Sequence, residues 1–351
     1  MKDIARMALT EGMVIAKDIT NYQNEVIVKA GTTVSTYTIQ KLARYNVMLV
    51  TIMEDVDYAV TYFEKIRLSD GFKEFEKAYN ITMPQYKNVM NALIDNGTAV
   101  DIDELLKLYN MVIDSTPNID SILDYLYNML PTEDDMTYAH CFNSALIAGV
   151  FAKWLNLSIE DTNTLVICGF LYDVGKLKLP YELIWKSGKL TPIEFERIKT
   201  HTILGFQLLA DFDYSPHVLK STLAHHERYD GSGYPSKLHD VQIDYFARII
   251  AIIDSYEAMT SARTYRPSKH PFQVIEIFEQ DAVKYDMEVL NPLLFHLANH
   301  MVGLTVQLDN DVRAEVVMIS QTHMSRPLLK DDNNTFIDLF SRKDLKITGI
   351  Y

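Results

Sequence analysis

Cysteine is scarce in this chain of 351 residues: Cys141 and Cys168 are the only two, and neither belongs to a CxxC pair. The sequence therefore gives no basis for a disulfide framework or a cysteine-paired metal site. Each cysteine lies inside an apolar helical pattern, so we predict that both are reduced core residues of a cytosolic protein.

Long apolar runs are also missing. The longest apolar stretches, such as residues 145–152 and 164–172, are too short to cross a bilayer. The N-terminal segment MKDIARMALTEG does not contain the apolar core of a signal peptide. We therefore expect a cytoplasmic protein with no membrane anchor and no secretion.

Positive charge is in deficit, because 33 Lys and Arg residues stand against 47 Asp and Glu residues, for a formal net charge of -14. Such a chain repels a polyanion, which argues against DNA or RNA as a non-specific partner. A small anionic ligand in a locally basic pocket remains compatible with this balance.

The residues that are present suit a soluble globular protein, since 48% are hydrophobic and 23% are charged. The pattern changes three times along the chain. Turn signals between short β-type runs predict a small α+β domain over residues 1–56, and helical spacing predicts a connector of three or four helices over residues 57–130. Dense apolar helices follow over residues 131–302, and alternating segments predict a small β-meander over residues 303–351.

Polar residues that can bind metals recur inside these apolar helices. Asp173 ends the apolar run LVICGFLYD, and Asp254 interrupts RIIAIIDSYEAM. A buried carboxylate costs several kcal/mol unless it is paired or binds a cation, so both aspartates need partners. The available partners are histidines at four positions: His140, His201, His225 and His226. Together these side chains predict a two-metal site with mixed nitrogen and oxygen ligands.

Three sequence blocks then show a family resemblance. The segment HHERYDGSGYP, residues 225–235, matches the HD-GYP signature HHExxDGxGYP at every fixed position. YDVGKLKLP and KSGKLTPIEFERIKTH precede it and ARIIAIIDSYEAMTSARTYR follows it, in the order seen in that family. The part from roughly Asp134 to Leu297 thus resembles an HD-GYP domain. The resemblance implies a mainly α fold with an HD-GYP helical bundle, and a metal-dependent phosphohydrolase whose usual substrate is cyclic di-GMP.

The resemblance also assigns roles to single residues. It implies two divalent ions, bridged by Asp173, with these ligands: His140, Asp173, His201, His225, His226 and Asp254. Lys176 matches the lysine that contacts the scissile phosphate, and Tyr234 shapes the pocket beside it. Arg263 and Arg266 match the positions that hold the far phosphate. The other histidines match no family position, and we predict surface or packing roles for them.

The chain departs from the family at its namesake histidine, because Tyr172 precedes Asp173 and HD becomes YD. A phenol has a reference pKa of about 10 and binds divalent ions poorly unless it is deprotonated, so one metal site is weakened. A ferric ion could recruit Tyr172 as a phenolate. Met136 replaces a glutamate of three-metal members, which argues against a third ion.

Two functions therefore stay open. In the first, the chain is a cyclic di-GMP phosphodiesterase that forms pGpG and GMP with reduced activity, using iron or manganese in preference to zinc. In the second, it is an inactive receptor that binds the dinucleotide and passes a signal through the connector, by which it could form a homodimer. Related cyclic dinucleotides share the same phosphate geometry and remain alternative ligands.

Overall fold

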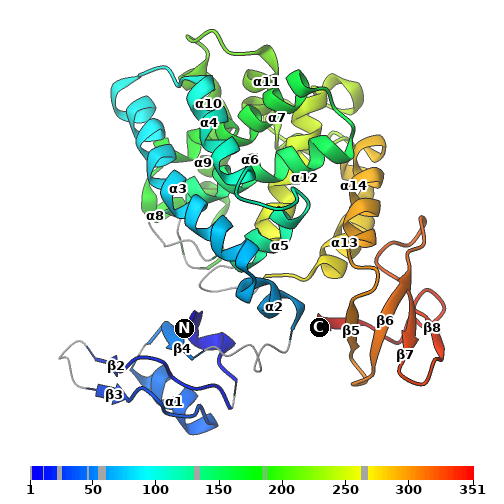
Figure 1. Cartoon of the computed structure of the whole chain (residues 1–351). Helices are drawn as coiled ribbons and strands as arrows, with labels where there is room; N and C mark the ends of the chain where they lie inside the picture. Colours follow the sequence, from blue (N-terminus) through cyan, green and yellow to red (C-terminus); the bar gives the residue numbers. More distant parts are fainter. Residues whose placement is uncertain are drawn as a thin grey trace.

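The structure is a computed structural model that describes residues 2–10, 12–21, 26–45, 47–53, 61–129, 135–184, 186, 188–261 and 268–351. It is mainly helical, with small sheets near both ends of the chain (Figure 1), which confirms the predicted fold class. Among the described residues, no helix is long and apolar enough to cross a membrane.

The N-terminal segment forms short strands and one helix around its own hydrophobic cluster, which includes Ile15, Leu42 and Val50. Its elements are β1 (Lys2–Ala5), η1 (Arg6–Ala8), β2 (Ile19–Thr20), β3 (Val26–Val28), α1 (Thr36–Arg44) and β4 (Leu49–Ile52). Strand β1 pairs with β4 and β2 pairs with β3, both antiparallel. Ser35 begins α1 by accepting a hydrogen bond from the backbone N–H of Thr38, as an N-cap serine does.

Four helices follow, and they pack into the main hydrophobic core. They are α2 (Tyr62–Leu68), α3 (Asp70–Asn96), α4 (Ile102–Ile113) and α5 (Ser121–Asn128). The buried hydroxyl of Tyr86 on α3 donates to the carbonyl of Phe170 at 2.7 Å, and the backbone N–H of Val100 donates to Tyr214 Oη at 2.7 Å. One continuous cluster thus joins these helices to the rest of the bundle.

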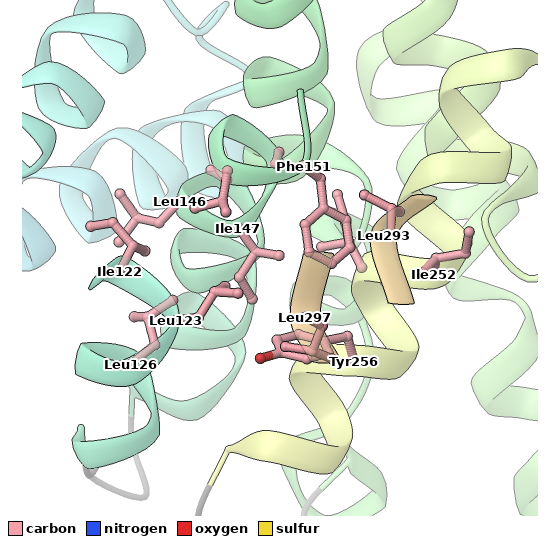
Figure 2. Packing of buried hydrophobic residues seen from close by; sticks show 14 of the residues in the cluster. Ile122, Leu123, Leu126, Leu146, Ile147, Phe151, Ile252, Tyr256, Leu293 and Leu297 are labelled. Carbon is pink, nitrogen blue, oxygen red and sulfur yellow. The ribbon is translucent and has the colours of Figure 1, made fainter. Parts of the chain in front are cut away.

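The central bundle is built around α6 (Met136–Trp154), which is apolar on nearly all sides. The other members are α7 (Ile159–Leu171), η4 (Val174–Lys178), α8 (Tyr181–Ile184), α9 (Pro192–Lys199), α10 (His201–Leu209), α11 (Pro216–Ala224), η5 (Asp240–Gln242), α12 (Tyr245–Thr260), α13 (Pro271–Gln280), η6 (Ala282–Lys284) and α14 (Met287–Asn299). Figure 2 shows Leu146, Ile147 and Phe151 of α6 between residues of α5 on one side and of α12 and α14 on the other. A helix that is apolar all round belongs at the centre of a core.

The C-terminal segment forms a five-stranded antiparallel sheet in the order β8-β7-β6-β5-β9. Its strands are β5 (Thr305–Leu308), β6 (Arg313–Met318), β7 (Leu328–Asp331), β8 (Phe336–Asp338) and β9 (Ile347–Ile350). The sheet lies beside α13 and α14 (Figure 1). Glu279 of α13 accepts a hydrogen bond from the backbone N–H of Met324 at 2.6 Å, and His270 contacts the carbonyl of Ile347 at 3.1 Å. These contacts fix the sheet against the bundle.

One helix boundary differs from the sequence pattern, in which Thr191, Pro192 and Glu194 predict the start of a helix that would carry His201 late in its length. Thr191 and Glu194 form the predicted capping box and Pro192 opens α9, but α9 ends at Lys199 and a separate helix starts at His201. The Thr200 hydroxyl donates to the carbonyl of Arg197 at 2.7 Å. His201 therefore lies at the start of α10 and not late in the helix that Thr191 begins.

Candidate metal centre

The turn from α7 into η4 places the central carboxylate. Helix α7 ends at Leu171, and Asp173 precedes the 3-10 turn that carries Lys176. Gly175 lets this turn approach α10 very closely, because an added Cβ would collide with the carbonyl of His201 and lie 2.6 Å from the backbone nitrogen of Gly205. The glycine in the YDVGK segment therefore brings Asp173 next to His201.

The two carboxylate oxygens of Asp173 face two different groups of side chains. Oδ1 lies 3.3 Å from His201 Nε2 and 3.9 Å from His225 Nε2, whereas Oδ2 lies 3.5 Å from His140 Nε2. Asp173 is completely buried, and apart from the ion pair between Oδ2 and the Lys176 ammonium neither oxygen has a hydrogen-bond partner among the described residues. A buried carboxylate in this state is suited to bind cations on both sides.

The first group, which we call the imidazole cluster, consists of His201, His225 and His226. One ring nitrogen from each lies within 4.8 Å of the others. Helix α11 ends at Ala224, so His225 caps it and His226 follows in the loop. The end of the helix thus allows two adjacent histidines to point to one place, which a continuing helix would prevent.

The proton positions in the imidazole cluster favour a cation. Nδ1 of His201 lies 2.6 Å from the carbonyl of Ile198, and Nδ1 of His225 lies 3.1 Å from the carbonyls of Ser221 and Thr222. When Nδ1 donates to these carbonyls, Nε2 of a neutral ring carries a lone pair. The two Nε2 atoms lie 3.1 Å apart. Two lone pairs repel each other at that distance unless a cation lies within reach of both.

Burial keeps these imidazoles neutral, the form that binds metals. Burial and the neighbouring His201 lower the pKa of His225 to about 4. Burial also lowers the pKa of His201, and burial together with His225 lowers that of His226 well below its usual value. These three histidines supply the nitrogen ligands of this site, and Asp173 supplies an oxygen ligand.

The second group, which we call the carboxylate cluster, consists of His140, Asp173 and Asp254, again within 4.8 Å of one another. Tyr172 enters it from the end of α7. Its hydroxyl lies 2.6 Å from His140 Nε2, 3.1 Å from Ser144 Oγ and 3.4 Å from Asp254 Oδ1. The tyrosine hydroxyl thus points into the site, where the family's histidine would stand.

His140 is engaged at both ring nitrogens. Nδ1 lies 2.5 Å from Glu257 Oε2, and Nε2 lies 3.1 Å from Asp254 Oδ1. Burial lowers the pKa of His140, but the carboxylates of Glu257 and Asp254 outweigh it and raise the pKa to about 9. Without a metal ion, a proton on His140 offsets part of the negative charge of this cluster.

Lys176 supplies a second positive charge. Its ammonium group forms an ion pair with Asp173 Oδ2 from one turn further along η4. Burial lowers the pKa of Lys176, but Asp173 and Asp254 raise it above its usual value. The residue is therefore a cation beside the carboxylate cluster, where it can meet an anionic ligand.

The GYP segment closes the other side of the imidazole cluster. The ring of Tyr234 stacks on that of His226, with centroids 4.7 Å apart. Gly233 packs directly on the chain that carries the histidines, since a Cβ there would lie 2.5 Å from the Cα of Glu227. The buried carboxylate of Glu227 accepts hydrogen bonds from the backbone N–H groups of Ser236 and Leu238.

The structure thus brings together most of the residues singled out in the sequence. The residues in or beside the two clusters are His140, Tyr172, Asp173, Lys176, His201, His225, His226, Tyr234 and Asp254. Arg263 and Arg266 lie outside the described residues.

Three supporting residues, Asn143, Glu257 and Glu227, were given no role from the sequence. Asn143 donates to Glu257 Oε1 at 3.0 Å and accepts from the Tyr79 hydroxyl at 2.8 Å, so it holds the carboxylate that contacts His140. Glu227 anchors the GYP loop. Asn143 could have been noticed in the sequence because it is a polar residue on the same side of the apolar helix α6 as His140 and Ser144. For Glu227 it was the third fixed letter of the signature.

The donor sets fit metals to different degrees. The imidazole cluster with Asp173 Oδ1 offers three neutral nitrogens and one carboxylate oxygen, a set that iron, manganese and zinc accept. The carboxylate cluster offers one imidazole and two carboxylates, with a protonated phenol added at the fourth position. Burial, Asp254 and Asp173 raise the pKa of Tyr172 well above its usual value. The first set fits a metal well and the second fits one less well.

Comparison with known proteins agrees with this geometry. A family model of the HD domain matches residues 124–289. Over these residues the chain is therefore similar to the HD domain family. This chain is 36% identical over 158 residues to a cyclic di-GMP phosphodiesterase of Thermotoga maritima and 32% identical over 182 residues to one of Pseudomonas aeruginosa. It is 37% identical over 162 residues to a 3′3′-cGAMP-specific phosphodiesterase of Vibrio cholerae.

These matches cover 43%, 52% and 46% of this chain, and 43%, 44% and 37% of the three relatives. The chain therefore spans less than half the length of those relatives. A solved HDG"Y"P protein from Bdellovibrio bacteriovorus has the same fold, with a TM-score of 0.50 and 16% identity over 84% of this chain and 99% of that one.

Proposed function

We propose that this chain is a metal-dependent phosphodiesterase that hydrolyses cyclic di-GMP to pGpG and GMP, with activity reduced by Tyr172. The observation that carries the proposal is the position of Asp173, whose two oxygens face the imidazole cluster and the carboxylate cluster. The substrate class follows from the names of the relatives, which are cyclic dinucleotide phosphodiesterases.

His201, His225, His226 and Asp173 would hold one divalent ion, and His140, Asp173 and Asp254 a second one. We propose iron or manganese in preference to zinc. Bound divalent ions supply Lewis acidity toward a phosphate oxygen and lower the pKa of water. The chain itself supplies the positions of these ligands and a shielded, partly buried site.

The remaining residues act directly on the substrate in this proposal. Lys176, a cation beside Asp173, would neutralise charge on the phosphodiester as it develops during cleavage. Tyr234, stacked on His226, limits the pocket on the GYP side. Arg263 and Arg266 would hold the far phosphate.

A second function is favoured by one observation, the Tyr172 hydroxyl at 2.6 Å from His140 Nε2. A neutral phenol that occupies a ligand of the carboxylate cluster weakens that metal site. The chain would then bind cyclic di-GMP without cleaving it and act as a receptor, with a homodimer formed through the helices before α6.

The test is a cleavage assay on the purified chain loaded with manganese or ferrous iron, with cyclic di-GMP or 3′3′-cGAMP as substrate and chromatography of the products. We expect pGpG and GMP from wild type and a loss of at least about a hundredfold in Asp173→Asn, since the bridging charge disappears. Asp240→Asn is the matched control, because Asp240 is exposed and lies outside both clusters.

Equal activity in wild type and Asp173→Asn would refute the proposed metal-dependent mechanism. Tight binding of cyclic di-GMP by wild type with no product would establish the receptor instead. If neither binding nor cleavage occurs, both functions are wrong.

A further inference from the structure

A basic pocket adjoins the imidazole cluster. It is formed by α9, the start of α10, the GYP loop and η6, and has a volume of about 630 Å³. His226 belongs both to its wall and to the imidazole cluster. We call it the GYP pocket. Its volume is that of a small-molecule site, for which about 300–1,000 Å³ is usual.

The charge of the GYP pocket is opposite to that of the chain. Four cationic side chains line it, against the single carboxylate of Glu196. Lys199 pairs with Glu196 at 2.7 Å and Lys284 pairs with Asp281 at 2.7 Å. Arg228 and Lys237 form no ion pair with any carboxylate among the described residues. In a chain of net charge -14, this concentration of cations favours an anionic ligand.

The pocket also has flat apolar surfaces. Lys199 lies between two aromatic rings, with its ammonium 4.8 Å from the centroid of Phe195 and 5.3 Å from that of Tyr234. Ile203 adds an aliphatic side chain to the same wall. Aromatic rings next to cations are the surfaces on which a nucleobase and its phosphate are held together.

We propose that the GYP pocket binds a phosphomonoester nucleotide, such as GMP or the terminal phosphate of linear pGpG. After the two ion pairs are counted, Arg228 and Lys237 remain, and the buried carboxylate of Glu227 offsets part of the charge of Arg228. A phosphomonoester carries about -1.5 to -2 charges at neutral pH, so the cationic side chains of the pocket attract it more strongly than the singly charged phosphodiester. The guanine part of this assignment rests on the proposed function, whereas the phosphomonoester part rests on the charges of the pocket.

The pocket lies next to the imidazole cluster, so it can receive a product formed there. Cleavage of one phosphodiester bond creates a phosphomonoester, and the GYP pocket is separated from the imidazole cluster by the side chain of His226. In this proposal the pocket binds a product of the reaction more tightly than it binds the cyclic substrate.

The experiment is calorimetric titration of the full chain, freed of metal with a chelator, with GMP, guanosine and inorganic phosphate as separate probes. We expect GMP to bind at least tenfold more tightly than either of the others. The double variant Lys199→Ala/Lys237→Ala should weaken GMP binding at least tenfold. Lys189→Ala/Lys220→Ala changes the charge equally at exposed lysines outside the pocket and should stay within twofold of wild type.

Three results would overturn the proposal: no GMP binding by the metal-free chain, GMP bound no more tightly than inorganic phosphate, or unchanged affinity in Lys199→Ala/Lys237→Ala. Unchanged circular dichroism and melting temperature of that variant would show that it is folded. Because the titration needs neither metal nor turnover, a chain that does not cleave cyclic di-GMP still tests the pocket. A chain that cleaves it but does not bind GMP would refute the pocket alone.

Discussion

The hydroxyl oxygen of Tyr172 lies 2.6 Å from Nε2 of His140, inside the carboxylate cluster. That hydroxyl therefore takes the place at which a second imidazole would complete the ligand set. His140 Nε2, which a metal would need, is occupied by this hydrogen bond and by the contact with Asp254. The imidazole cluster has no such competitor among the described side chains that form it.

The first prediction concerns metal content. Wild type should retain about one tightly bound ion per chain after dialysis, and Tyr172→His should retain about two, because an imidazole replaces a protonated phenol. Inductively coupled plasma mass spectrometry gives the stoichiometry. Tyr172→Phe is the control, since it removes the hydroxyl and adds no ligand. Two ions in wild type would show that the phenol does not impair the carboxylate cluster.

The second prediction concerns stability. Manganese added to the chelated chain at a hundredfold excess over its dissociation constant should stabilise the fold by about 3 kcal/mol, because the ion binds only the folded state. Differential scanning calorimetry should show the melting temperature rise in wild type and in His323→Ala, a half-buried histidine of the C-terminal segment outside both clusters. His225→Ala should show little or no rise. An equal rise in His225→Ala would place the ion elsewhere.

The third prediction concerns the approach of η4 to α10. Gly175→Ala should lower the free energy of unfolding by about 3 kcal/mol or more, because the new methyl group collides with the carbonyl of His201. Gly303→Ala is the control: its Cβ would meet nothing, and only its positive φ of 86° adds a cost of about 1 kcal/mol. Urea titration measures both. Similar values for the two variants would show that η4 moves away freely.

Much of the site could be predicted because its residues stand in a recognisable local order. Ser158 and Thr191 cap helices and Pro216 begins one, as is typical of a serine or threonine, or of a proline, placed just before a helix-forming run. The five alternating segments after Gly303 were likewise readable as strands. These features depend on residues within a few positions of each other, where sequence patterns are most reliable.

Other features depend on contacts between distant segments and could not be predicted. The two oxygens of Asp173 face different clusters because of the way η4 packs on α10. Likewise, β9 pairs with β5 only because the C-terminal end of the chain folds back beside β5. The contact between Glu257 of α12 and His140 of α6 joins two residues that are 117 positions apart in the sequence. Strand β1 was missed, because Lys2–Ala5 becomes a strand only by pairing with β4.

The last prediction is a pH dependence of stability at His300. Its Nε2 donates to Asp124 Oδ2 at 2.8 Å, the oxygen that also accepts from the Tyr62 hydroxyl, so the pair ties α14 to α5 and α2. The hydrogen bond with Asp124 raises the pKa of His300 above its usual value. The folded state therefore holds this proton more tightly than the unfolded state does.

It follows that the stabilisation by His300 is complete below pH about 6.5, the unfolded value, and is lost as pH rises through the higher folded pKa. The difference in unfolding free energy between wild type and His300→Gln should be on the order of 1 kcal/mol at pH 6 and should shrink by pH 9. Urea titrations at several pH values measure this difference, with His323→Gln as the control. A difference that grows with pH would mean that the ion pair does not carry the stability of this contact.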